Sequence, residues 1–305
     1  MKNILACPMC HGKLVELGCV SCNITYPKNN GVPSFICREM YPSDNAYAEA
    51  LRIIDFWGNG WEKRLAEPEH KPWFECDQGA LIKYAENIME LHKAGDSILG
   101  VDIHEDSLKN KVTLNIGCGA GAEALVLTYS GANCIAMDIT SQAARAAEYL
   151  MHKVGGDGIG IQADTRFIPL ETSSVDVVYS SGVLHHSPRI TQSITEIYRV
   201  LKPGGKAYIM LYATWSVLFV QMRLMLSMGE KAWETGSRKN PYTTTYTVNE
   251  CRDMFSQFKN VRIRKTGGNL KHIKIIGKYM PASLDHLLSP YLGSCLNIVA
   301  EKSNL

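Results

Sequence analysis

Residues 112–121, VTLNIGCGAG, decide the fold of this chain. The apolar run 112–116 predicts a buried strand, and the three glycines after it predict a tight turn that opens a helix. Glycine lets the backbone pass close to a ligand, and the first turn of a helix offers N–H groups to it. The glycine spacing is GxGxG, whereas the dinucleotide-binding fingerprint is GxGxxG. The stretch therefore predicts a ligand-binding strand–turn–helix, and by itself it leaves the ligand open.

Short apolar runs alternate with helical ones on both sides of this stretch. The predicted strands are 112–116, 134–137, 160–163, 175–180 and 207–212, and the predicted helices between them are 123–129, 141–153 and 191–201. A helix over 248–258 and strands over 261–265 and 294–302 follow. Alternation at this spacing predicts an α/β fold with a parallel, doubly wound sheet.

An acidic residue ends the second predicted strand. Asp138 stands 21 residues after Gly117, where a carboxylate can accept hydrogen bonds from both hydroxyls of a ribose. This arrangement fits NAD as well as S-adenosylmethionine. The alternative is that Asp138 only caps the following helix.

Four segments in order resemble the class I S-adenosylmethionine-dependent methyltransferases of the type 11 group, which includes enzymes of ubiquinone and menaquinone biosynthesis. They are the glycine loop, ADT at 163–165 followed by IPL at 168–170, VDVVYSSGVLHH at 175–186, and EIYRVLKPGG at 196–205. The resemblance covers about residues 110–212, and dehydrogenases do not carry this set. It implies a methyltransferase enzyme with a Rossmann-like, doubly wound, seven-stranded sheet.

The resemblance also implies a role for each residue of the cofactor site. Gly117, Cys118, Gly119 and Gly121 would approach the methionine and adenosine parts of S-adenosylmethionine, Asp138 and Ile139 would lie at the ribose, Asp164 and Thr165 at the adenine, and Ser180 would line the cofactor. Asn115 stands where the family usually has Asp or Glu, which helps to hold the cofactor's ammonium group. Because Asn offers only a neutral carbonyl oxygen, we expect a weaker contact there.

Two histidines, His185 and His186, follow the fourth predicted strand, beside the expected position of the methyl group. A hydroxyl or neutral amine acceptor needs a base to remove its proton, and histidine titrates near neutral pH. We expect one of the two rings to face the site, and we favour His185. The alternative is that both rings only pack or form hydrogen bonds within the loop.

Four cysteines gather near the N-terminus as Cys7-x2-Cys10-x8-Cys19-x2-Cys22. Two CxxC knuckles joined by a short insert predict a four-sulfur, structural Zn²⁺ site, and the alternative is redox-active or merely buried cysteines. About residues 4–37 resemble the zinc ribbon that accompanies some tRNA, rRNA and protein methyltransferases. In that family, the ribbon supports the structure or docks a partner.

The remaining segments complete the predicted organisation: a zinc ribbon over 1–40, a helical cap or linker over 41–108, and a methyltransferase domain over 109–305 with a lid insertion at 213–247. The cap contains an aromatic cluster, namely Phe56, Trp57, Trp61, Trp73 and Phe74, which either packs an interface or lines a pocket; we favour packing.

Composition limits the function classes. The chain has 305 residues, 46% of them hydrophobic and 20% charged, which is typical of a soluble globular protein of about two domains. A net charge of +2 does not indicate a dedicated nucleic-acid or anionic-membrane binder. Without a signal-peptide pattern or an uninterrupted apolar span, the expected location is the cytoplasm.

These observations favour a methyltransferase that acts on a small molecule, such as a metabolite, a natural product or a sugar-lipid precursor. The first alternative is an rRNA, tRNA or protein methyltransferase whose ribbon docks the macromolecule, although its few basic residues give a thin phosphate-binding surface. A non-catalytic cofactor-binding module and an NAD-linked oxidoreductase are weaker alternatives. The acceptor, the methylated atom and the oligomeric state stay open.

Overall fold

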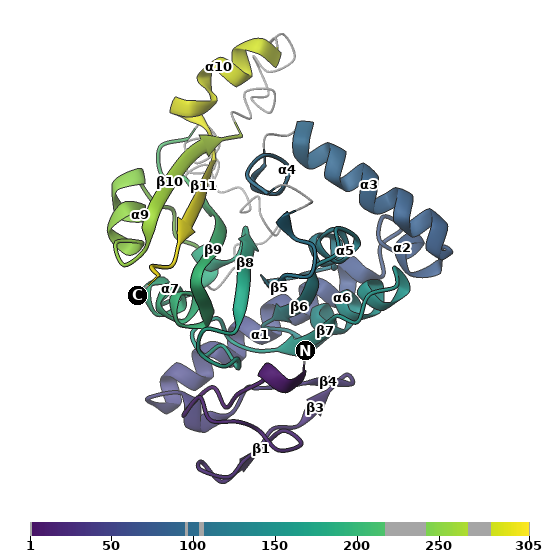
Figure 1. Cartoon of the computed structure of the whole chain (residues 1–305), viewed down its shortest axis with the longest axis vertical. Coiled ribbons are helices and arrows are strands. Elements are labelled where there is room, and N and C mark those ends of the chain that lie inside the picture. The colour runs from purple at the N-terminus through teal and green to yellow at the C-terminus, as the bar shows by residue number, and fades with distance from the viewer. Residues whose placement is uncertain (1, 95–96, 104–106, 217–241, 268–281, 305) are drawn as a thin grey trace, which may run out of the picture.

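The computed structural model describes residues 2–94, 97–103, 107–216, 242–267 and 282–304. A seven-stranded sheet runs through its centre in the order β10-β11-β9-β8-β5-β6-β7 (Figure 1). The strands are β5 (Val112–Ile116), β6 (Asn133–Asp138), β7 (Ile159–Gln162), β8 (Val175–Ser181), β9 (Leu201–Tyr212), β10 (Lys259–Thr266) and β11 (Cys295–Glu301). Neighbouring strands from β7 to β9 are parallel, and β11 is antiparallel to both β9 and β10. The predicted doubly wound, seven-stranded sheet is confirmed.

Helices cover the two faces of this sheet. One face packs against α3 (Gln78–Ala94), α4 (Ile98–Val101), α5 (Ala122–Tyr129) and α6 (Ser141–Lys153). The other packs against α7 (Ile190–Val200) and α9 (Val248–Met254). The four C-terminal residues of β5 are fully buried because the strand lies between both layers, which explains its apolar sequence.

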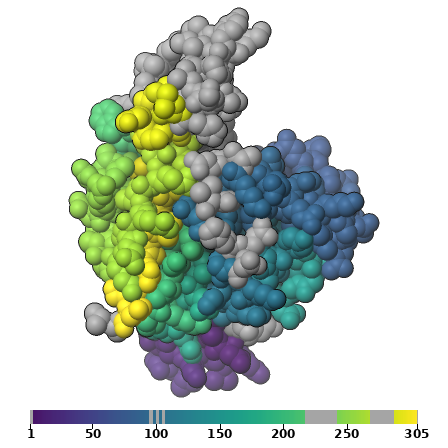
Figure 2. Space-filling model, turned by 45° about the horizontal axis from the view of Figure 1, so that its top comes forward, coloured from purple at the N-terminus to yellow at the C-terminus, as the bar shows by residue number. Residues whose placement is uncertain are grey.

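The N-terminal residues complete the second face. They form four two-residue strands, β1 (Gly18–Cys19), β2 (Ile24–Thr25), β3 (Lys28–Asn29) and β4 (Val32–Pro33), at one edge of the molecule (Figure 2). The connection 163–174 between β7 and β8 contains no helix, and the N-terminal residues pack on this face of the sheet in the place of one. The backbone N–H of Ala6 donates to the Pro169 carbonyl oxygen at 3.0 Å. The backbone N–H of Phe35 donates to the Gln162 carbonyl oxygen at 2.8 Å. Tyr26 and Phe35 are buried in the same hydrophobic cluster as the sheet, so the two parts share one core.

A long helix, α1 (Asp44–Leu65), follows the N-terminal segment. It begins after Ser43, whose hydroxyl accepts a hydrogen bond from the Ala46 N–H at 3.2 Å. The short helix α2 (Lys71–Glu75) follows, and α10 (Ala282–Leu292) lies at the end of the molecule opposite the N-terminal strands (Figure 1). None of the described helices is both long enough and apolar enough to span a bilayer.

One strand differs from the sequence-based expectation, and part of the expected lid cannot be compared with it. β9 starts at Leu201 rather than at 207, because Gly204 and Gly205 form backbone hydrogen bonds with Lys302 at the end of the sheet. Of the expected lid insertion 213–247, residues 217–241 lie outside the described residues.

Candidate active site

A cavity of about 580 Å³ opens at the carboxyl ends of β5, β6 and β8. Parallel α/β sheets bind ligands at this edge, and the volume is within the range of small-molecule sites. The loops that follow the strands form one wall. The opposite wall is α1, which contributes Ile53, Trp57 and Trp61.

The glycine loop lies directly under α1. Gly117 and Gly119 have φ angles of +69° and +52°, which disfavour residues with a side chain. A Cβ atom on Gly119 would lie 2.7 Å from the Trp61 ring, and one on Gly117 would lie 2.2 Å from Val183. The close approach of α1 and of the loop after β8 therefore requires glycine at both positions.

Asp138 ends β6 at the centre of the cavity wall. Its Oδ2 accepts a hydrogen bond from the Gly119 N–H at 3.1 Å, and its Oδ1 accepts two bonds of 2.9 Å from the backbone and hydroxyl of Thr140. Burial raises the pKa of this carboxyl, and the hydrogen bonds from Thr140 and Gly119 oppose that shift. The side chain is held in a fixed orientation on the cavity surface.

Asp164 also lines the cavity, and two neighbours hold it. Arg166 forms a buried ion pair with its Oδ2 at 2.6 Å, and the Tyr41 hydroxyl donates to the same oxygen at 3.1 Å. Tyr41 lies between the N-terminal segment and α1, so the segment before α1 reaches a residue of the cavity wall. Burial raises the pKa of Tyr41, and the Asp164 charge adds to that shift, which keeps the hydroxyl protonated as a donor.

The predicted cofactor residues divide into two groups. Gly117, Cys118, Gly119, Asp138, Ile139, Asp164 and Thr165 line the cavity. Asn115, Gly121 and Ser180 are buried beside it and are not on its surface. The Asn115 Oδ1 and the Ser180 hydroxyl find no hydrogen-bond partner in the described part of the chain.

The two predicted histidines also separate. His186 lines the cavity, 5.0 Å from the Trp57 ring between ring centres, and its Nδ1 lies 2.9 Å from the Tyr242 carbonyl oxygen. His185 is fully buried, and its ring centre lies 3.8 Å from that of Tyr212, with the two ring planes tilted by 30°. The structure therefore places His186, rather than the favoured His185, on the cavity wall.

Several cavity residues were not among the predicted site residues. Trp57, Trp61 and Trp73 of the aromatic cluster line the cavity instead of only packing an interface, together with Arg64, Glu123 and Tyr212. Trp57 and Trp61 are four residues apart, which puts them on the same side of a helix. That spacing signals a shared face, but the sequence does not show what the face covers.

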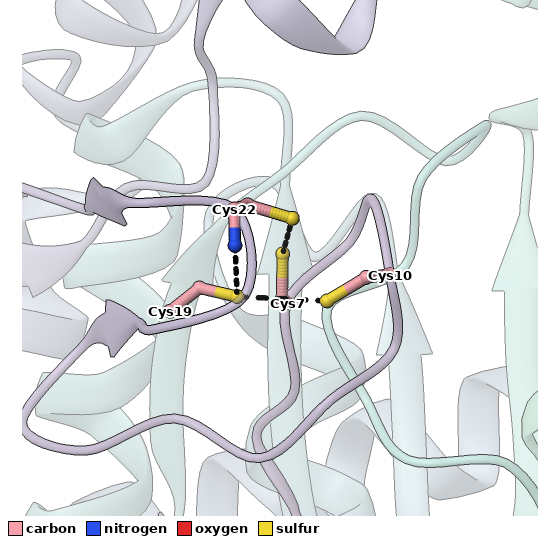
Figure 3. A group of neighbouring side chains, drawn as sticks. All are labelled: Cys7, Cys10, Cys19 and Cys22. Atoms are coloured by element: carbon pink, nitrogen blue, oxygen red, sulfur yellow. Dashed lines mark hydrogen bonds between the residues drawn. The ribbon is translucent and has the colours of Figure 1, made fainter.

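The four N-terminal cysteines come together (Figure 3). Their sulfur atoms all lie within 4.8 Å of one another, with 3.8 Å between Cys7 and Cys22 and 3.5 Å between Cys10 and Cys19. Four sulfurs at 2.3 Å from a tetrahedral ion are about 3.8 Å apart. The cluster therefore has the size and the donor atoms of a four-thiolate metal site.

Comparison with known proteins identifies the class of the central domain. Residues 114–209 match the family model described as "Methyltransferase domain". The match covers less than half of the chain, and the strand order and the glycine loop agree with a methyltransferase domain over these residues.

Similar curated proteins include two O-methyltransferases. The chain is 30% identical over 146 residues to malonyl-acyl-carrier-protein O-methyltransferase of Methylococcus capsulatus, covering 47% of this chain and 52% of that protein. It is 28% identical over 204 residues to the chloroplastic tocopherol O-methyltransferase of Arabidopsis thaliana, covering 61% and 55%. The chain thus spans about half the length of these relatives. A solved methyltransferase from Methanosarcina mazei is 21% identical, with a TM-score of 0.48 over 67% of this chain and 97% of that one.

Proposed function

We propose that this protein transfers a methyl group from S-adenosylmethionine to a small-molecule acceptor. The observation that carries the proposal is that one cavity holds both halves of such a site. The glycine loop, Asp138 and Asp164 lie on its cofactor side, and His186, Tyr212 and Trp57 lie around the loop after β8. When bound, S-adenosylmethionine supplies an activated methyl carbon whose transfer leaves the bonding electron pair on sulfur.

The residues on the cofactor side have the donors and acceptors for this ligand. Asp138 presents a fixed carboxylate to the ribose hydroxyls, and Asp164 presents one to the adenine amino group. Because Arg166 and Tyr41 already hold Asp164, its position is set before a ligand enters, which lowers the cost of ordering the site.

On the acceptor side, we assign the general base to His186. Its Nδ1 contacts a carbonyl oxygen, which only accepts hydrogen bonds, so Nδ1 carries the hydrogen of the neutral ring and Nε2 the lone pair. A ring in this tautomer can accept the proton that the acceptor loses as its new bond to carbon forms. Trp57 and Tyr212 give this end of the cavity an aromatic surface, which suits an acceptor with an apolar or flat part.

We further propose that Cys7, Cys10, Cys19 and Cys22 bind a structural Zn²⁺ ion. Cys7 and Cys19 are buried in the core that the N-terminal segment shares with the sheet. The ion would therefore stabilise the segment that covers the helix-free connection 163–174. The relatives with named small-molecule acceptors are consistent with the small-molecule reading, and the ribbon in other methyltransferases is the basis of the macromolecular alternative.

A labelled-methyl assay tests the proposal. The protein is incubated with methyl-labelled S-adenosylmethionine and with the small-molecule, RNA and protein fractions of a cell extract in separate reactions. We expect label in the small-molecule fraction. Label confined to RNA or protein would overturn the small-molecule assignment and favour the macromolecular alternative.

A further inference from the structure

Asn115, buried beside the cavity, supplies no charge to the proposed cofactor site. The methionine part of S-adenosylmethionine carries an ammonium and a carboxylate group. Asn115 is 1% exposed, and its Oδ1 has no hydrogen-bond partner among the described residues. An amide oxygen does not neutralise an ammonium group, and a charge-assisted hydrogen bond is about twice as strong as a neutral one.

A carboxylate stands on the cavity wall, just after the glycine loop in the sequence. Glu123 is in the first turn of α5, two residues after Gly121, and lines the same cavity. The Trp61 ring, which touches Gly119, also carries the Arg64 guanidinium, whose central carbon is 5.1 Å from the ring centre. The cavity wall therefore includes both an acid beside the glycine loop and a guanidinium, which match the two charges of an amino acid; Glu67 and Glu69 also line the cavity, from the segment after α1.

Glu123 is available to a ligand cation. None of the salt bridges in the described ranges involves it. Its charge is felt in the interior, because it adds to the effect of burial in raising the pKa of Tyr179. Glu123 also adds to the effect of burial in raising the pKa of Cys118, which belongs to the glycine loop itself.

We propose that the Glu123 carboxylate binds the ammonium group of the cofactor. It would take the role of an acidic residue at position 115, where this chain has Asn. This inference rests on the proposed function and adds a cofactor-binding residue to it. It also explains how a chain with Asn at position 115 retains a charged contact for the methionine part.

Calorimetry with two ligands tests the assignment. S-adenosylhomocysteine has the amino-acid part, whereas 5′-methylthioadenosine has the same adenosine and sulfur without it. We expect Glu123→Gln to weaken S-adenosylhomocysteine binding by about tenfold, because a charge-assisted hydrogen bond to the ammonium group is replaced by a neutral one. The affinity for 5′-methylthioadenosine should not change, because that ligand has no ammonium group.

A conservative variant and a control complete the design. Glu123→Asp keeps the negative charge and should retain more of the S-adenosylhomocysteine affinity than Glu123→Gln, a difference that a purely structural role of Glu123 would not produce. Glu90→Gln, at an exposed acid of α3, should leave both affinities unchanged. Unchanged S-adenosylhomocysteine binding by Glu123→Gln, or an equal loss for both ligands, would overturn the inference. Failure of the unaltered protein to bind either ligand would instead overturn the proposed function.

Discussion

The backbone N–H of Gly119 donates a hydrogen bond to the carboxylate of Asp138, with 3.1 Å between nitrogen and Oδ2. The glycine turn after β5 is therefore tied to the end of β6, and the two cofactor motifs form one unit. The opposite carboxylate oxygen accepts from Thr140, so both oxygens of Asp138 are oriented by the backbone that surrounds them. A ligand that binds Asp138 also contacts a loop whose position Asp138 sets.

This relationship makes Asp138 the most sensitive position for cofactor binding. We expect Asp138→Ala to weaken S-adenosylhomocysteine binding by about 10²-fold or more, because two charge-assisted hydrogen bonds to the ribose are lost and the Gly119 N–H loses its acceptor. Calorimetry measures the change. Asp157→Ala, at an exposed acid in the loop before β7, is the matched control and should bind normally. Retained affinity of Asp138→Ala would exclude the ribose role.

His186 provides the test of the acceptor side. His186→Ala should lower turnover by about 10²-fold or more, the usual contribution of a general base, while leaving S-adenosylhomocysteine affinity intact. The measurement is single-turnover methyl transfer to the acceptor identified by the labelled-methyl assay.

The neighbouring histidine is the control for this variant. His185→Phe keeps a ring against Tyr212 and removes no group from the cavity surface, so its turnover should stay near that of the unaltered protein. The assignment of His186 would be refuted by normal turnover of His186→Ala, and a loss confined to the His185 variant would return the role to His185.

The cysteine cluster predicts a metal content of one ion per chain. Cys10→Ser should abolish stoichiometric Zn²⁺ by elemental analysis and lower the melting temperature, because a structural zinc site contributes to folding free energy. Cys76→Ser, outside the cluster, should keep the metal. Purified protein without zinc, or full zinc content in Cys10→Ser, would contradict the four-thiolate site.

Strong local patterns made most of the central fold predictable. The predicted strand 112–116 has the bounds of β5 and the predicted helix 141–153 those of α6, because burial on two faces and helical spacing are both visible in short windows. β9 was misjudged at its start. Lys202-Pro203-Gly204-Gly205 has the composition of a turn, but pairing with Lys302, about 100 residues away, makes it part of the sheet.

The cavity wall formed by α1 was not predictable in the same way. The sequence places Trp57 and Trp61 on one side of a helix, but nothing local tells that this side faces Gly119 and His186 rather than another helix. The same limit applies to the two histidines. Their adjacency predicts that they point in different directions, and only the tertiary contact with Tyr212 decides which ring is buried.

Burial of His185 has a consequence for stability that pH titration can measure. Loss of solvent lowers the pKa of its imidazole well below the ordinary value, and the neighbouring His186 adds to the shift. The folded protein therefore leaves His185 neutral at a pH where the unfolded chain, with a pKa near 6.5, binds a proton. Since stability rises with pH wherever the unfolded state binds more protons, it must fall as the pH drops below about 6.5.

The expected size of this effect is about 1.4 kcal/mol of unfolding free energy between pH 7.5 and 5.5 from this one group, provided that its folded-state pKa lies below that interval. Urea unfolding of the unaltered protein and of His185→Phe at a series of pH values isolates it, because every other titrating group is common to both chains. The two stability curves should diverge below pH 6.5, with the steeper fall in the unaltered protein. Parallel curves would show that His185 accepts its proton in the folded state and is not held neutral against Tyr212.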